Sequence, residues 1–164
     1  MNPHMLMAAG RAAHHAINLA SQRMGHRHTH ALARLRAEGL EMIVNRVTGA
    51  QIIAMRDQFQ LVIDIFVAEA RHVMAERVKD KDAHRTSTDV VLRVELQSSI
   101  ERADEQLAQI RKDAQELHST TSMFLLKAGE LLAEAGEKLG LSYAPVPLPQ
   151  ELATPPVIDV EADE

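Results

Sequence analysis

The sequence contains no cysteine and no tryptophan, and it has only one tyrosine and three phenylalanines. Without cysteine the chain can form neither disulfides nor thiolate metal sites, as is usual in reducing compartments. Ala, Leu, Glu, Gln, Arg and Met are abundant instead. Because these residues lose the least free energy on entering a helix, the composition predicts an all-α protein.

Long apolar runs are missing as well. No uninterrupted apolar stretch approaches the roughly 18 residues of a membrane-spanning helix. The first residues also lack the cationic start and apolar block of a secretory signal. We therefore expect a cytoplasmic protein without a transmembrane segment, and 164 residues are enough for one domain with a core.

Acidic residues are absent from positions 1–37, which hold five arginines and six of the nine histidines. The whole chain nevertheless has a net charge of −5, because 23 acidic and only 13 basic residues follow. We expect residues 1–28 to form a cationic helical arm that lies on the acidic faces of the body. The alternative is an anionic partner that binds Arg23, Arg27, Arg34 and Arg36. A nucleic acid is disfavoured, because its binding proteins usually carry denser cationic patches and stacking aromatic side chains.

Alternating histidines at positions 26, 28 and 30 interrupt this arm. On a helix His26 and His30 would share a face, as a zinc site requires, but the arm offers no carboxylate to orient the ligands. We expect no metal and no cofactor here. The histidines instead predict an arm whose positive charge rises as the pH falls through about 6.5.

Apolar periodicity predicts four helices, over residues 4–23, 29–46, 49–79 and 87–139, with a polar connector at 79–84. Thr48 and Gln51 have the spacing of a capping box at the start of the third helix. That helix is apolar around most of its circumference, so other helices, other copies or an apolar surface must cover it. Its main stripe contains Ile52, Met55, Phe59, Ile63, Phe66, Ala70 and Val73, and Ile53, Val62, Val67 and Met74 widen it.

The fourth helix carries a regular seam of apolar residues, spaced alternately by four and three. This spacing is typical of coiled coils, and it predicts an elongated antiparallel hairpin or bundle over residues 29–140. If residues 119–122 do not break the helix, its 53 or so residues span about 80 Å. The seam consists of Leu96, Ile100, Ala103, Leu107, Ile110, Ala114, Leu117, Thr121, Phe124, Ala128, Leu131 and Ala135.

The remaining tail, residues 141–164, contains five of the six prolines and five carboxylates. A segment with this composition buries too little apolar surface to offset its ordering entropy, so we expect a disordered tail. Nor does any catalytic constellation emerge from the sequence. Glu69 and His72 have the spacing of a di-iron ligand pair, but such sites need two further carboxylates and a second pair. We expect the protein not to be an enzyme.

The stretch TGAQIIAMRDQF, from Thr48 to Phe59, resembles the signature region of the phasin family, the small helical proteins that coat polyhydroxyalkanoate granules. The resemblance covers residues 30–80 and implies a non-enzymatic protein that adsorbs to a granule or lipid surface. The apolar side chains that would contact the surface are Ile52, Met55, Phe59, Ile63, Phe66, Val67, Phe124, Leu125, Leu131 and Leu132. The alternative is a coiled-coil scaffold that forms homo-oligomers or binds partner helices through the same stripes.

Overall fold

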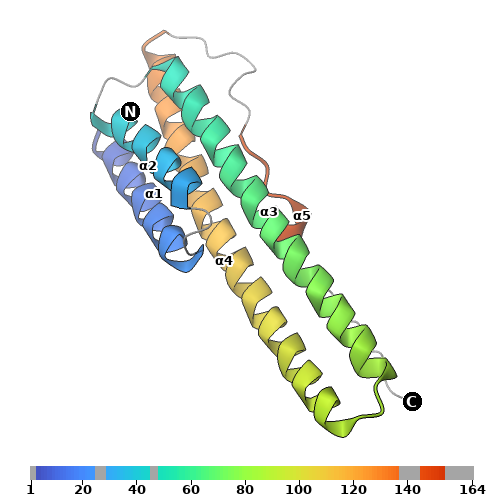
Figure 1. Cartoon of the computed structure of the whole chain (residues 1–164). Coiled ribbons are helices and arrows are strands. Elements are labelled where there is room, and N and C mark those ends of the chain that lie inside the picture. The colour runs from blue at the N-terminus through green and yellow to red at the C-terminus, as the bar shows by residue number, and fades with distance from the viewer. Residues whose placement is uncertain (1–2, 25–28, 45–47, 137–144, 154–164) are drawn as a thin grey trace.

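The computed structural model describes residues 3–24, 29–44, 48–136 and 145–153, and all regular secondary structure within these ranges is α-helical (Figure 1). This agrees with the all-α prediction. The helices are α1 (Pro3–Met24), α2 (Thr29–Val44), α3 (Gly49–Thr86), α4 (Val90–Glu134) and α5 (Gln150–Ala153).

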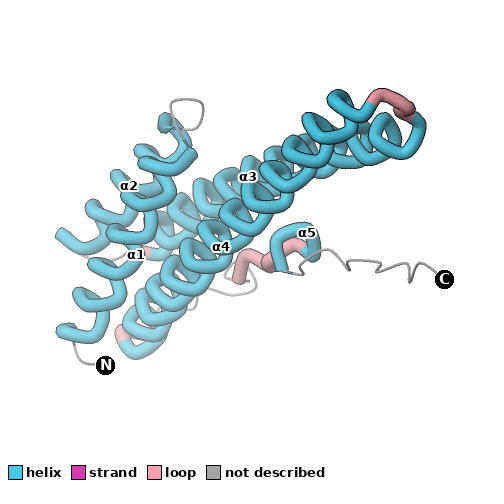
Figure 2. The backbone as a smooth tube through the Cα atoms, turned by 90° about the horizontal axis from the view of Figure 1, so that it is seen from below, coloured by secondary structure: helices cyan, strands magenta, loops and turns pink. Residues whose placement is uncertain are grey.

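The two long helices, α3 and α4, form an antiparallel hairpin that sets the length of the molecule (Figure 1). The shorter helices α1 and α2 pack beside one half of it, which we call the base. Around the base α1 contacts α2, α2 contacts α3, α3 contacts α4 and α4 contacts α1, as in a four-helix bundle. At the other half α3 and α4 project beyond α1 and α2 (Figure 2).

Capping residues determine where α3 begins and where the turn after it forms. The Thr48 hydroxyl accepts from the Gln51 amide (3.3 Å), and the Gln51 side chain accepts from the Thr48 amide (3.1 Å), which confirms the capping box. The polar connector predicted at residues 79–84 is wrong, because α3 continues to Thr86. That segment contains no glycine or proline to end a helix, and the turn forms later, where Ser87 is extended and Asp89 caps α4.

Helix α4 is unbroken through the polar segment 119–122, where the sequence left a break open. Thr120 Oγ1 donates to the Glu116 carbonyl (2.9 Å), and Ser119 Oγ donates to the same carbonyl (3.2 Å). Hydroxyls that bond back to the preceding turn leave the helical backbone intact. The predicted last turn, residues 137–139, lies outside the described residues.

The core lies at the base, where all four helices contribute apolar side chains. Gly39 of α2 faces Met55 of α3, and a Cβ at Gly39 would lie 3.3 Å from Met55 Cε. The absent side chain therefore lets α2 and α3 approach closely. The buried apolar residues of the base and its flank include Ala13, Ala16, Ile17, Leu32, Leu35, Ile52, Met55, Phe59, Val62, Ile63, Phe66, Leu107, Leu117, Phe124 and Ala128.

The projecting half of the hairpin has no such core. No residue from 74 to 99 is buried. Polar contacts join the two helices there, since Ser99 Oγ donates to Asp80 (2.6 Å) and Arg77 pairs with Asp104. We call this end, residues 74–99, the tip.

The tail departs from the sequence prediction over residues 145–153, which are not disordered. Val146 is 3% exposed and Leu152 is fully buried, and both belong to the same core cluster as α3 and α4. Composition alone missed this, because two well-placed apolar anchors are enough to order a short polar segment on a preformed surface. The rest of the predicted tail lies outside the described residues.

One buried polar group makes a stability prediction possible. Thr121 is fully buried, and its hydroxyl has no hydrogen-bond partner among the described residues. Because an unsatisfied buried hydroxyl costs about 1–3 kcal/mol, Thr121→Val is expected to raise the free energy of unfolding by about 1 kcal/mol, measured by urea denaturation. The control is Thr120→Val, which loses a bonded hydroxyl and should give no gain. A destabilised Thr121→Val variant would contradict the prediction.

Candidate functional site

The structure places the apolar residues predicted to bind a surface or partner helix inside the bundle. Phe59, Ile63 and Phe66 are at most 1% exposed, because α2, α4 and α5 pack against α3. A surface or partner could contact these side chains only if the helices separated. Buried with them are Ile52, Met55, Val67, Phe124, Leu125 and Leu132, and Leu131 is partly buried against the same cluster.

The cationic arm is part of the same bundle. Helix α1 buries Ala13, Ala16 and Ile17 in the core, so apolar packing contributes to its contact with the body. Arg34 and Arg36 are exposed. The side chain of Arg23 and the whole of Arg27 lie outside the described residues, as do His26 and His28.

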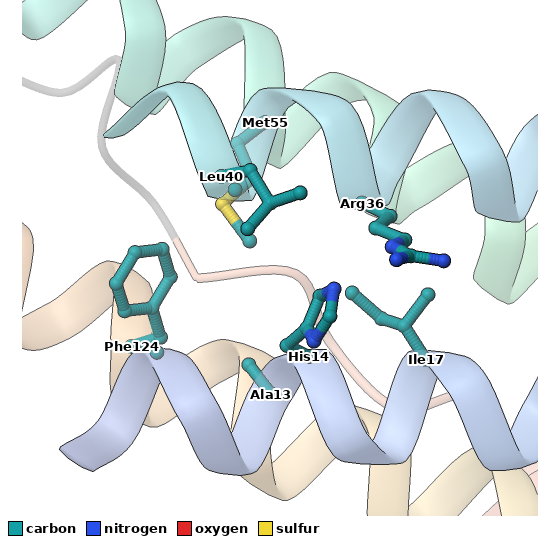
Figure 3. A pocket seen from close by; sticks show the side chains of 9 residues that line it. Ala13, His14, Ile17, Arg36, Leu40, Met55 and Phe124 are labelled. Atoms are coloured by element: carbon teal, nitrogen blue, oxygen red, sulfur yellow. The ribbon is translucent and has the colours of Figure 1, made fainter. Parts of the chain in front are cut away.

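A small cavity lies between α1, α2, α3 and α4 beside His14 and Arg36 (Figure 3). Its volume is about 10 Å³, which is roughly the space of one water molecule. The Nε2 atom of His14 is buried with no hydrogen-bond partner in the described part of the chain. A cavity of about 10 Å³ is far too small for a substrate or cofactor.

Metal ligands do not gather in the described ranges, where no group of three or more His, Asp or Glu side chains is placed to hold an ion. His72, one half of the di-iron spacing, is exposed on α3. None of the described helices combines the length and the apolar character needed to cross a bilayer.

Exposed apolar side chains gather instead at the tip. Val90, Val91 and Val94 are 74%, 68% and 63% exposed. Val94 is four residues from Val90 and three from Val91, so its side chain neighbours both of them on the surface of α4. Single exposed apolar residues are common, but three adjacent valines form a contiguous patch. We call these three residues the tip patch.

A groove of about 360 Å³ runs from the tip patch along α4. Val90 and Val94 form its apolar part, and both signs of charge lie along it, from Arg93 and Glu101. The lining residues are His84, Val90, Arg93, Val94, Gln97, Ser98 and Glu101.

Sequence reasoning missed the tip patch, although the sequence holds a signal for it. The seam of α4, extended backwards from Leu96, passes through Arg93 and Asp89, so the three valines lie off the seam. β-branched residues are also poor helix formers, and their clustering in the first turns serves no local purpose. Apolar residues outside the seam of a regular helix predict a second contact surface.

No family model matches the sequence, and neither a curated protein nor a solved structure matches it significantly. The exposed surfaces of this chain are therefore its clearest indication of function.

Proposed function

We propose that the chain is a non-enzymatic assembly protein that pairs with a second copy through the tip patch. The observation that carries the proposal is the exposure of Val90, Val91 and Val94, each above 60%, on a projecting hairpin end. Covering these side chains removes apolar area from water at about 25 cal/mol per Å². In this proposal the coiled-coil seam of α4 pairs with α3 of its own chain, and the tip supplies the contact between chains.

The opposite charges of Arg93 and Glu101, which line the groove beside the tip patch, favour a second copy of the chain as the partner. In a two-fold pair, residue i of one copy contacts residue j of the other, and j contacts i. Arg93 and Glu101 are each four positions from Gln97 along α4. An antiparallel pair of α4 helices with its two-fold axis beside Gln97 therefore brings Arg93 of each copy opposite Glu101 of the other. In the same register Val90 and Val94 of each copy lie at the level of residues 104 and 100 of the other, so the tip patch packs against the α4 helix of the partner and not against its valines.

The test is the mass of the chain as a function of concentration, measured by sedimentation equilibrium. The wild type is expected to dimerise, and Val94→Glu is expected to raise the dissociation constant at least 10-fold. The matched control is Leu126→Glu, which changes a residue of α4 that is 54% exposed but lies outside the tip, and it should dimerise normally. A wild type that stays monomeric at millimolar concentration would refute the proposal.

A charge exchange makes the test specific for the two-fold geometry. Arg93→Glu and Glu101→Arg should each weaken the dimer, because each places like charges together. The double variant should restore the dimer, because it exchanges the signs on both copies. If the double variant is as weak as the single ones, the pair does not have this register.

Granule coating is a second candidate, and the tip patch offers apolar area for it without opening of the bundle. The proposal is that the valines adsorb to a polyester or lipid surface. Co-sedimentation with polyester particles tests it, with Val94→Glu as the variant expected to lose binding. A wild type that remains in the supernatant would exclude coating.

A further inference from the structure

Residues 145–153, which we call the strap, pack against both α3 and α4 (Figure 2). We call the face of these two helices that the strap covers the strap groove, which is distinct from the groove beside the tip patch. Residues 145–149 have no regular secondary structure, and the single turn α5 follows. Val146 and Leu152 are buried at the two ends, and Leu148 packs against the core between them. The strap therefore binds the hairpin as a short peptide with apolar anchors.

Three side chains of α4 bind the main chain of the strap. Arg111 Nε donates to the carbonyl of Glu151 (3.0 Å), and Gln115 Nε2 donates to the carbonyl of Leu152 (2.8 Å). His118 Nε2 lies 2.8 Å from the carbonyl of Val146. Because a carbonyl oxygen only accepts, this nitrogen must carry the proton. Positions 111, 115 and 118 are spaced by four and three, so they share one face of α4.

All three of these contacts use carbonyl oxygens of the strap, and none uses an N–H. Proline keeps its carbonyl but has no N–H, so Pro147 and Pro149 remove none of the hydrogen bonds between the strap and α4. Their fixed φ angles also favour the extended conformation before binding, which reduces the entropy lost on docking. The strap groove is therefore suited to proline-containing peptides.

An acidic residue of the strap pairs with α3. Arg71 of α3 donates through Nε to Glu151 Oε1 (3.1 Å), and its Nη2 contacts the same oxygen. This hydrogen bond holds the pKa of Glu151 below its ordinary value. Arg111 binds the carbonyl of the same residue, so two guanidinium groups lie at this point of the strap.

We infer that the strap groove is a docking site for short proline-containing acidic peptides of other proteins, and that the strap is its built-in occupant. The pattern it accepts is Val-Pro-Leu-Pro-X-Glu-Leu, as in residues 146–152. An incoming peptide displaces the strap and takes over its carbonyl contacts. Arg111 favours such a replacement over an empty strap groove, because its side chain is largely buried and needs an acceptor.

The test uses the full chain with a vacated strap groove. Val146→Asp and Leu152→Asp together remove both anchors of the strap. A fluorescent peptide with the wild-type sequence of residues 145–153 is then added, and binding is followed by anisotropy. The peptide is expected to bind the vacated chain at least 10-fold more tightly than the wild type, whose strap groove is occupied. If the vacated chain stays helical by circular dichroism and does not bind the peptide, the inference is wrong.

A charge exchange tests whether the peptide binds through the Arg71–Glu151 pair that the strap forms. Arg71→Glu in the vacated chain should weaken binding of the wild-type peptide several-fold and favour a peptide with arginine in place of Glu151. Gln115→Leu should also weaken binding, whereas Lys112→Ala, at an exposed position of the same helix, should leave it unchanged. Equal affinity of the Arg71→Glu chain for both peptides would overturn the assignment. These results do not depend on whether the tips dimerise.

Discussion

Phe59→Ala is expected to lower the free energy of unfolding by about 3–5 kcal/mol. Phe59 is fully buried in α3, and its ring centroid lies 5.8 Å from that of His118 on α4. The substitution removes apolar contacts between two helices and leaves a cavity that the close-packed base cannot fill. Urea denaturation followed by circular dichroism measures the change, which should appear as a lower midpoint with an unchanged slope.

The control is Leu126→Ala, since this residue is 54% exposed and its truncation should change the free energy by less than about 0.5 kcal/mol. Equal stability of Phe59→Ala and the wild type would contradict a closed bundle in solution. That outcome would favour surface coating as the sequence predicted it, in which the α3 stripe is available for adsorption. A large loss leaves a partner only the apolar side chains that the closed bundle exposes, among them the tip patch.

Leu152→Ala is expected to detach the strap, at a cost of about 2 kcal/mol. This is the low end for truncation of a buried leucine, because the strap can separate locally while the helices stay folded. Leu152 is fully buried, and its amide and that of Ala153 both donate to the Pro149 carbonyl (3.0 Å each). Hydrogen exchange should show these two amides losing protection while those of α3 keep theirs.

The exposed Pro145 supplies the comparison for this experiment. Pro145→Ala keeps both anchors and should retain the protection of Leu152 and Ala153. Equal loss of protection throughout α3 in Leu152→Ala would show that the strap unfolds together with the bundle. A displaceable strap would then be excluded.

The sequence predicted the buried faces well, because burial repeats with the helical period. The main stripe from Ile52 to Val73 is buried, and so is most of the seam, although Leu96 is half-buried and Ala135 is exposed at its ends. Ile53, which was predicted to widen the stripe, is exposed. The start of α3 was also predicted, since a capping box is a local interaction. The end of α3 was not, because charged residues continue a helix as readily as they form a connector.

The strap and the tip patch were harder to predict, for two different physical reasons. The order of the strap depends on Arg111, Gln115 and His118, which lie far from it in the sequence and belong to a surface that exists only after folding. The tip patch depends on what the fold leaves uncovered. Periodicity shows which residues are apolar on one face, but it does not show how far α1 and α2 extend along α3.

The separation of base and tip has a consequence for how this protein can evolve. The buried side chains that stabilise the fold lie in the base, whereas residues 74–99 contribute no buried side chain. Substitutions at Val90, Val91 or Val94 can therefore alter what the hairpin binds with little loss of stability. Divergent copies of such a chain could acquire new partners at the tip while the base preserves the fold.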